Sequence, residues 1–297
     1  MPVTFRDKLQ SNKFMITTEV TPPKGVDTSS FLKDAEQLQR YVDAFNVTDN
    51  QRAVMRMSSI AVGKMLKEAG HETIVQFTCR DRNRLALQSD LLGAWALGIH
   101  NICVMTGDHT TKGDHPATKP VYDLDSVQLL NTVKKLNEGY DLSGNRLEQF
   151  PDFVVGAVSN TDPLQPMQHI KLRKKTSIGI DFIQTQAVYD IEEFACFLEK
   201  VSDIDVPIIA GIIPLKSAKM AKYMNRNIPG IRVPEEFITR MENAEEPASE
   251  GMEIATKIIR ELKKMCRGIH LMPVGQHTYT REILKMSGST EGRTHNE

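Results

Sequence analysis

The stretch MITTEV, residues 15–20, has the pattern that decides the fold: a short run rich in β-branched residues that ends beside a polar side chain, Glu19. Seven more runs of this kind follow along the chain. They are AFNVTD (44–49), TIVQFTC (73–79), NICVMTGD (101–108), FVVGAVSN (153–160), FIQTQ (182–186), PIIAGIIP (207–214) and IHLMPVGQ (269–276). Eight short strands separated by helical patterns predict a (β/α)8 TIM barrel, in which the carboxyl ends of all strands open onto one mouth.

The segments between these runs predict the helices of a single domain. Helical patterns begin at about residues 28, 52, 83, 125, 160, 216, 246 and 277, and the second is expected to run from 52 to 69. Glycines that close a helix before the next strand are Gly70, Gly98, Gly179 and Gly268. No linker interrupts the chain, so residues 1–286 are expected to form one barrel, and the polar end, residues 287–297, a disordered tail.

The charge balance argues against nucleic acid and membranes as partners. The 297 residues include 37 basic and 38 acidic side chains, so there is no excess positive charge to attract nucleic acid or an anionic membrane. No apolar run approaches the roughly 18 residues that span a bilayer. The first residues, MPVTFRDKLQ, lack the basic and then apolar order of a signal peptide. These features predict a cytoplasmic protein.

The cysteines and histidines form no metal-binding pattern. Cys79, Cys103, Cys196 and Cys266 are singly placed, without a CxxC pair, and the eight histidines include no HxxxH pair. We therefore expect no protein-bound metal. Cys103 in a strand and Cys196 in a helix are expected to be buried as small apolar groups. Cys79, at the end of a strand, is expected to face the mouth.

Three polar residues at strand ends are the main candidates for chemistry. Glu19 is a carboxylate in an otherwise apolar strand, and burial without partners favours the protonated form that a general acid needs. Asp108 follows Gly107, which allows close approach to a flat ligand, and the amide of Gln186 can hydrogen-bond a heterocycle. The structural alternatives are an ion pair of Glu19 inside the barrel, a turn capped by Asp108, and a barrel hydrogen bond made by Gln186.

A basic cluster follows the fifth strand. Arg173, Lys174 and Lys175 are consecutive on a predicted helix, where they form either a solvated face or a group that reaches over the mouth to phosphates. The chain has no GxGxxG after its first strand and no GxxxxGK[ST] motif. Neither a Rossmann dinucleotide site nor a P-loop is therefore predicted.

Six motifs, taken together and in order, carry a resemblance to a known family. They are TTEVTPPKG, FNVTDN, QFTCRDRN, VMTGD, LRKKTSIGIDFIQTQAVYD and IIAGIIP. This set resembles the methylenetetrahydrofolate reductase family over about residues 13–275, nearly the whole chain. The resemblance implies an α/β barrel that holds a flavin, FAD or alternatively FMN, at its mouth. It also implies reduction of 5,10-methylenetetrahydrofolate to 5-methyltetrahydrofolate, usually with NAD(P)H as the electron donor.

The resemblance implies roles for the three strand-end candidates. Glu19 matches the family's acid, which protonates N10 of the folate and opens the five-membered ring. Asp108 matches a carboxylate near the flavin and the pterin, where it stabilises the cationic iminium. Gln186 matches an amide that binds the pterin. Glu19 and Asp108 are therefore the expected catalytic residues, and all three are expected to bind the substrate.

The resemblance also implies a cofactor-binding set. Thr48 matches a hydroxyl that contacts the flavin, and Thr78 and Asp108 belong to the same expected set. Lys174 and Lys175 match a pair of basic residues that hold the flavin's phosphates.

The chain departs from the well-studied bacterial members at several positions. Gln76 replaces a histidine, Val158 and Asp162 replace an aromatic residue and a histidine, and Ala218 replaces a phenylalanine that stacks on nicotinamide. The chain is more similar to members from anaerobic carbon-fixing bacteria, some of which carry FMN and receive electrons from partner proteins. The expected donor is therefore NAD(P)H or an electron-transfer protein. The expected assembly is a homo-oligomer or a subunit of a larger redox complex.

Two other functions fit parts of the pattern. The first is another flavin-bearing barrel, such as a proline-dehydrogenase-like enzyme, which would aim arginines at a carboxylate and would not need an acid at Glu19. The second is a non-catalytic barrel that scaffolds an electron-transfer complex. A scaffold gains nothing from desolvating Glu19, Asp108 and Gln186, so the reductase hypothesis is preferred.

Overall fold

The strands close into a barrel, as the sequence predicts. The computed structural model describes residues 3–11, 13–162, 165–273 and 277–289. Eight parallel strands pair in chain order, and β1 pairs with β8, so the sheet has no edge. The strands are β1 (Met15–Val20), β2 (Ala44–Val47), β3 (Thr73–Thr78), β4 (Asn101–Met105), β5 (Val154–Ser159), β6 (Phe182–Ala187), β7 (Ile208–Ile212) and β8 (Gly268–Leu271). The chain therefore has the expected single-domain (β/α)8 architecture.

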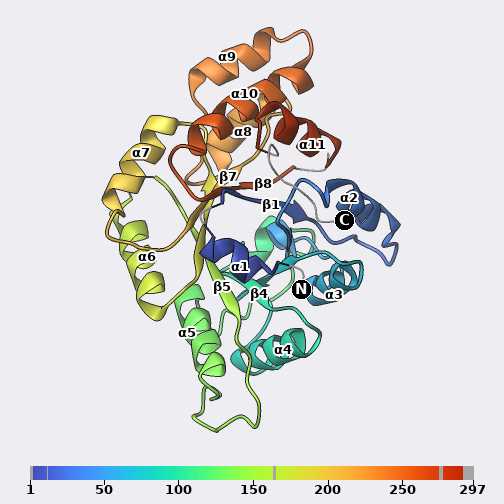
Figure 1. Cartoon of the computed structure of the whole chain (residues 1–297), viewed down its shortest axis with the longest axis vertical. Coiled ribbons are helices and arrows are strands. Elements are labelled where there is room, and N and C mark those ends of the chain that lie inside the picture. The colour runs from blue at the N-terminus through green and yellow to red at the C-terminus, as the bar shows by residue number, and fades with distance from the viewer. Residues whose placement is uncertain (1–2, 12, 163–164, 274–276, 290–297) are drawn as a thin grey trace.

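Helices surround the barrel on all sides (Figure 1). The helices are α1 (Phe5–Gln10), α2 (Ser29–Leu38), α3 (Ser59–Glu68), α4 (Arg84–Ala96), α5 (Ser126–Asn137), α6 (Pro166–Ile178), α7 (Ile191–Lys200), α8 (Ala218–Asn227), α9 (Glu235–Asn243), α10 (Pro247–Leu262) and α11 (His277–Met286). Two 3₁₀ turns, η1 (Gln51–Ala53) and η2 (Thr110–Lys112), lie in the loops after β2 and β4. None of the helices within the described ranges is long and apolar enough to cross a membrane.

Several helix predictions need correction. The helix expected from 52 to 69 begins only at Ser59, because the turn before it has left-handed backbone angles. The helix expected near residue 160 begins at Pro166, where the proline occupies the first helical turn. Asn160 instead accepts a hydrogen bond from the backbone N–H of Asp162 in a turn, and Pro163 lies outside the described residues. Helices α1 and α9 were not predicted.

The barrel interior is apolar at its amino-terminal end. Side chains alternate along each strand between the interior and the helical layer. Phe182 fills the centre of this amino-terminal part of the interior. A Cβ atom at Gly156 would lie 2.1 Å from the ring of Phe182, so Gly156 has no room for a side chain. The inward-facing residues that pack together here are Phe5, Leu9, Met15, Ala44, Ile74, Cys103, Val154, Phe182 and Ile209.

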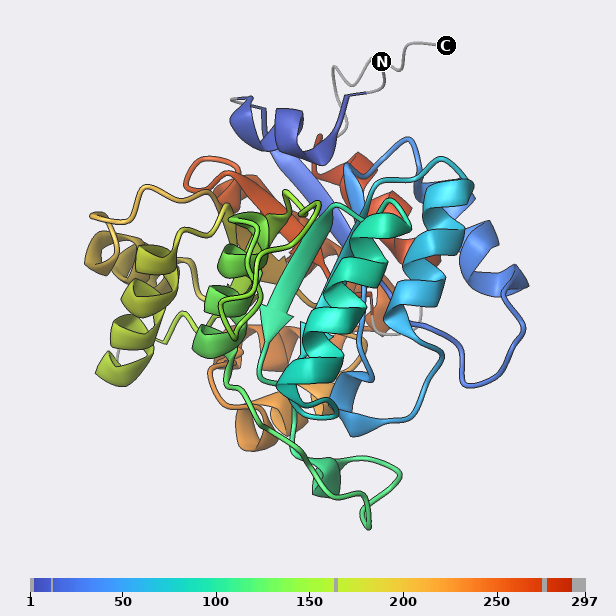
Figure 2. The same ribbon diagram turned by 90° about the horizontal axis from the view of Figure 1, so that it is seen from below.

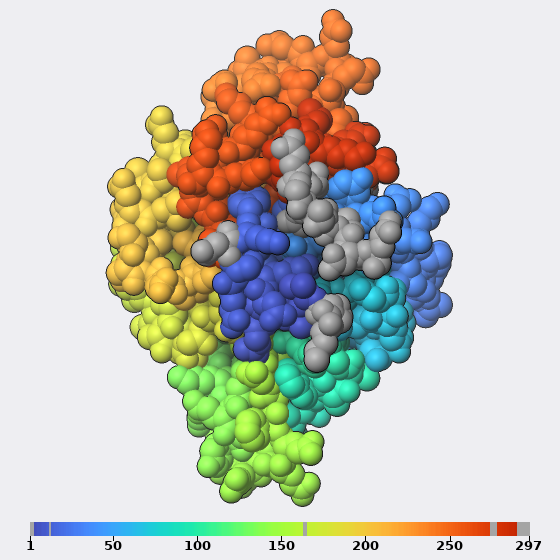
Figure 3. Space-filling view, in the orientation of Figure 1, coloured from blue at the N-terminus to red at the C-terminus, as the bar shows by residue number. Residues whose placement is uncertain are grey.

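Helix α1 closes this end of the barrel. It lies across the centre of the ring, and its side chains fill the middle of this face (Figures 1 and 3). A capping box between Thr4 and Asp7 starts the helix, and Phe5 inserts edge-on against Phe182 with ring centroids 5.4 Å apart. The loop that carries η2 projects from the opposite end (Figure 2). The mouth formed by the strand carboxyl ends is therefore the open end.

Three further expectations differ from the structure. Cys103 is fully buried as expected, but Cys196 is exposed, because the buried face of α7 is formed by Phe194 and Phe197. Cys79 does not face the mouth: it packs in the apolar layer between strands and helices, where burial raises its pKa to about 12. Gly268 is the first residue of β8 rather than a left-handed helix end.

The expected tail is partly folded. Ser287 and Ser289 are buried, and the backbone N–H of Ser289 donates to the carbonyl of Leu284. Lys263 donates to the carbonyl of Gly288 at 3.0 Å. The first three residues of the segment 287–297 therefore pack on the domain. Residues 290–297 and the strand-end residues Gly275 and Gln276 lie outside the described residues.

Removing the aromatic plug should destabilise the barrel. The substitution Phe5→Ala should lower the free energy of unfolding by about 3–5 kcal/mol, because it leaves a cavity against Phe182. Urea denaturation of both variants measures this change. The control Phe150→Ala, at a residue 56% exposed, should change stability by no more than about 0.5 kcal/mol. Equal effects at the two positions would show that α1 does not stabilise the barrel.

Candidate functional site

Glu19 lies inside the barrel near the mouth. It is the fifth of the six residues of β1 and pairs in register with Asn46 of β2. Only 8% of the surface of Glu19 is exposed to solvent. The side-chain amide of Gln51 donates to Glu19 Oε2 at 3.1 Å. On the other side, Nε2 of the buried His270 lies 3.7 Å from Glu19 Oε1. The carboxyl group is therefore buried but has polar neighbours, including the basic residue that the structural alternative anticipated.

His270 is held by a second interior residue. Its Nδ1 hydrogen-bonds Thr17 Oγ1 at 2.9 Å, which orients the ring so that Nε2 faces Glu19. Thr17, Glu19 and His270 thus form a continuous polar row across β1 and β8. Such a row can hold a proton close to any ligand atom that approaches Glu19.

Thr48 directly follows β2, and Thr78 is the last residue of β3. These two strands come next after β1, which carries Glu19, in the order of the barrel. Thr48 is fully buried, and its hydroxyl oxygen has no hydrogen-bond partner within the described ranges. Thr78 donates from both its hydroxyl and its backbone N–H to Asp49 Oδ2, each at 2.9 Å. Arg82 also pairs with this carboxylate. The hydroxyl of Thr48 is therefore available to a ligand, whereas that of Thr78 is already engaged.

Arg80 connects three loops at the mouth. Its side chain is 2% exposed and makes a two-pronged ion pair with Asp81, at 2.8 and 2.7 Å. The same guanidinium donates to the carbonyl of Asn50 at 3.1 Å and to that of Asp108 at 3.2 Å. The loops after β2, β3 and β4 are therefore held in one arrangement by a single buried cation.

Asp108 lies on the rim of the mouth, three residues beyond β4. Its carboxylate is 46% exposed, with the ammonium of Lys112 3.7 Å away, while its carbonyl is fixed by Arg80. Gly107 before it has φ +86°, and a Cβ atom there would lie 3.2 Å from the side chain of Thr78. The backbone approach that Gly107 permits is therefore made to β3, and the Asp108 carboxylate points into solvent-accessible space.

Gln186 lies near the end of β6, and a pair of amide side chains, Asn46 of β2 and Gln184 of β6, lies close to it in the fold. Gln186 is half-buried, and its Oε1 accepts from the backbone N–H of Ala187 at 3.1 Å. It precedes the last residue of β6 rather than ending the strand. Closer to the amino-terminal end of β6, Gln184 Oε1 accepts a hydrogen bond from Asn46 Nδ2 at 2.7 Å. Within the described ranges, Asn46 Oδ1 and Gln184 Nε2 have no partner, so unsatisfied polar atoms lie beneath the mouth.

The two predicted phosphate-binding lysines have different environments. Lys174 is exposed on α6. Lys175 is buried, and its ammonium donates at 2.6 Å to the carbonyl of Val158, near the carboxyl end of β5. Burial, with the charge of nearby Lys171, lowers the pKa of Lys175 to about 8. Arg173, the third member of the cluster, pairs with Asp203 on the surface.

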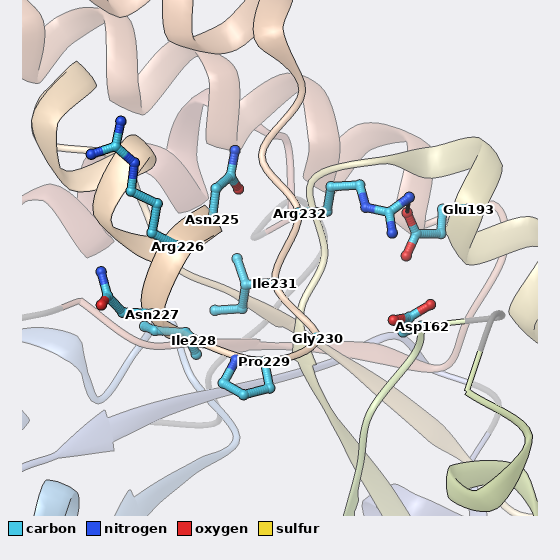
Figure 4. Close-up of a pocket in the computed structure, with 10 residues that line it drawn as sticks. All are labelled: Asp162, Glu193, Asn225, Arg226, Asn227, Ile228, Pro229, Gly230, Ile231 and Arg232. Carbon is cyan, nitrogen blue, oxygen red and sulfur yellow. Dashed lines mark ion pairs between the residues drawn. The ribbon is translucent and has the colours of Figure 1, made fainter. Parts of the chain in front are cut away.

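A hollow of about 390 Å³ lies between the loops that follow β5 and α8 and the start of α7 (Figure 4). Arg232 points toward Asp162 and Glu193 across it, and its Nη1 lies 3.6 Å from Glu193 Oε2. Arg226 lines the other side. None of the seven predicted site residues lines this hollow, and its charges have both signs, so it indicates no particular ligand.

Three residues of the mouth were not predicted from the sequence. His270 is a polar residue at an inward position of an apolar strand, and the reasoning that selected Glu19 would have found it. Gln51 and Arg80 gave no such signal, because their contacts depend on how separate loops meet. No group of three potential metal ligands was found in the part of the chain that the structure describes.

Comparisons with known proteins show the family of the chain. A family model described as methylenetetrahydrofolate reductase matches residues 4–288. The 5,10-methylenetetrahydrofolate reductase of Salmonella typhimurium is 25% identical over 255 residues, which cover 84% of this chain and 81% of that protein. Methylenetetrahydrofolate reductase 2 of Schizosaccharomyces pombe is 27% identical over 251 residues, which cover 77% of this chain. The match covers only 38% of that longer yeast protein and 42% of a probable methylenetetrahydrofolate reductase from Caenorhabditis elegans.

A solved structure shares the fold. It is an uncharacterized protein from Clostridium thermocellum that binds two copies of 5-methyl-5,6,7,8-tetrahydrofolic acid. The TM-score is 0.62 at 16% identity, over 95% of this chain and 96% of that one. The family model covers nearly the whole barrel, including every strand whose carboxyl end forms the mouth. The chain therefore belongs to the methylenetetrahydrofolate reductase family.

Proposed function

We propose that this protein is a flavin-dependent enzyme that reduces 5,10-methylenetetrahydrofolate to 5-methyltetrahydrofolate. The observation that carries the proposal is the buried carboxyl of Glu19 inside the mouth, with His270 and Gln51 on either side. The family match and the folate bound by the structural relative from Clostridium thermocellum support the choice of substrate.

The residues present fit a flavin at the mouth. The buried hydroxyl of Thr48 has no partner within the described ranges and suits a hydrogen bond to a polar ring atom. The ammonium of Lys175 lies near the carboxyl end of β5, and Lys174 beside it is free to meet a phosphate from the solvent side. A bound flavin would supply the hydride, which no side chain of the protein can carry. The same residues suit FAD or FMN, and FAD is our first choice.

Glu19 would act on the substrate as a general acid. A protonated carboxyl beside N10 of the folate can transfer its proton as the carbon–nitrogen bond of the five-membered ring breaks. The ring of His270, 3.7 Å away and oriented by Thr17, can return a proton to Glu19 after turnover. Neither of these two proton transfers requires water to reach the carboxyl group.

Asp108 and Gln186 would bind and stabilise the ring-opened substrate. The iminium formed by ring opening carries a positive charge, which the carboxylate of Asp108 at the rim would stabilise. Because this carboxylate is 46% exposed and near Lys112, solvent screens it and its effect should be modest. The Nε2 amide of Gln186 can donate to the pterin, since its Oε1 is occupied by the backbone of Ala187.

The electron donor is proposed as NAD(P)H or an electron-transfer protein. Ala218, the first residue of α8, offers no aromatic surface on which a nicotinamide ring could stack. This favours a protein donor, and the chain would then be one subunit of a redox complex. A proline-dehydrogenase-like oxidation is less favoured, because the fully buried arginine at the mouth, Arg80, is already paired with Asp81.

The acid role of Glu19 makes a direct prediction. Glu19→Gln keeps the shape of the side chain but cannot donate a proton to N10, so folate reduction should slow by about 10²–10⁴-fold. Single-turnover oxidation of the reduced protein by 5,10-methylenetetrahydrofolate measures this rate. The control Glu253→Gln, on the exposed face of α10, should react like the parent protein. A normal rate in the Glu19 variant would remove this residue from the acid role.

The phosphate role of Lys175 predicts pH-dependent flavin binding. Lys175→Met should weaken flavin binding by about tenfold or more, since a hydrogen bond to a charged group contributes about 1.5–3 kcal/mol. Because the pKa of Lys175 is lowered to about 8, affinity in the parent protein should fall as the pH rises through that value. Quenching of flavin fluorescence during titration reports both effects.

The matched control is Lys257→Met, at an exposed lysine on α10. It should keep the parent affinity and the parent pH dependence. If Lys175→Met behaves in the same way, the ammonium of Lys175 holds only the Val158 carbonyl and does not contact the cofactor.

A further inference from the structure

We propose that Gln51 is a positioning residue for Glu19, held in place by a strained turn that three other loops clamp. The inference rests on the proposed function, because it assumes that the carboxyl of Glu19 takes part in the reaction. Neither the sequence motifs nor the family match assigns a role to Gln51.

The contact that carries the inference crosses from the second loop to the first strand. Gln51 begins η1, just beyond β2, and its Nε2 donates to Glu19 Oε2 at 3.1 Å. His270 lies nearest the other carboxyl oxygen, Oε1. The two neighbours approach different oxygens, so together they define both the position and the rotation of the carboxyl group.

The backbone on both sides of Gln51 is strained. Asn50 has φ +45°, Arg52 has φ +58° and Ala53 has φ +57°, and none of them is a glycine. Side chains with a Cβ atom rarely adopt this left-handed region, and such strain persists only where the surrounding structure enforces it. Strained residues of this kind cluster at functional sites. A relaxed turn would carry Gln51 in a different direction.

Contacts from the neighbouring loops enforce this turn. Arg80 donates to the carbonyl of Asn50, and the side-chain oxygen of Asn50 accepts from the backbone N–H of Arg56 at 2.9 Å. Gly113, from the loop after β4, packs closely on Ala53. A Cβ atom added to Gly113 would lie 1.7 Å from the carbonyl oxygen of Ala53.

Asp114 links the same turn to two further segments. Its carboxylate accepts from the backbone N–H of Met55 at 3.0 Å and pairs with Lys24 of the loop after β1 at 2.5 Å. The turn is therefore held from the loops after β1, β3 and β4. This arrangement fixes the side chain of Gln51, which donates to the carboxyl of Glu19.

The hydrogen bond fixes the orientation of the acid. It holds the carboxyl in one rotation, so that the same oxygen meets the substrate in each turnover.

A double-mutant cycle tests the inference. Gln51→Met keeps the length of the side chain but removes the donor, and folate reduction should slow by up to about tenfold, the loss expected for one hydrogen bond. In the Glu19→Gln background the same substitution should cause little further slowing, because the group through which Gln51 acts has been replaced. In Gln51→Met alone, the rate at saturating folate should fall, whereas the folate concentration that gives half of that rate should change little, because Gln51 orients the acid and does not bind the substrate.

The control Gln39→Met, at the exposed end of α2, should change neither the rate nor the half-saturating folate concentration. Equal slowing by Gln51→Met in both backgrounds, or an unchanged rate with only a lower melting temperature, would overturn the positioning role. Full activity of Glu19→Gln itself would instead overturn the proposed function. The two failures are therefore distinguishable in one series of variants.

Discussion

Closure of the parallel sheet is the constraint on which the rest of the molecule depends. Pairing of β1 with β8 leaves no strand edge and brings all eight carboxyl ends to one face. Helix α1 fills the opposite face with Phe5, so within the described residues the mouth is the open end of the barrel. Glu19 and His270, which are 251 positions apart in the sequence, become neighbours for this reason. The two ends of the barrel also differ in polarity: the interior is polar near the mouth and apolar near α1.

A second layer of organisation comes from buried charge in the loops. Arg80 is nearly inaccessible to solvent, and its guanidinium makes four hydrogen bonds, two to the carboxylate of Asp81 and two to backbone carbonyls. Separating the partners of such a buried ion pair leaves an uncompensated charge, so moving the loops apart would cost free energy. The strained turn around Gln51 depends on this rigidity. The proposed chemistry therefore uses a carboxyl whose surroundings are fixed from outside its own strand.

The sequence predicted the barrel and the places of its strands, but not the loop geometry. The bounds of β1 are those of the predicted run, and β3 and β4 begin at the first residue of theirs, because β-branched runs are bounded by clear turn signals. Gly70, Gly98 and Gly179 have the expected positive φ angles. By contrast, the six-residue α1 is too short for its pattern to stand out, and its position depends on packing against Phe182. The turn at residues 50–53 resembles the start of a helix in sequence, and only contacts with Arg80 and Gly113 reveal its strain.

The candidate site was predicted in the same uneven way. Glu19, Thr48 and Gln186 come together at the mouth because strand ends must converge in a barrel. The environments of Asp108 and Lys175 could not be read from the chain, since exposure of the first and burial of the second depend on loop and helix packing.

The most direct test of the account is the visible spectrum of the purified protein during a folate half-reaction. The protein, loaded with flavin and reduced without oxygen, should regain its yellow absorbance when 5,10-methylenetetrahydrofolate is added, with one 5-methyltetrahydrofolate formed per flavin. A protein that binds no flavin, or whose reduced flavin stays colourless in the presence of the folate, would contradict the account.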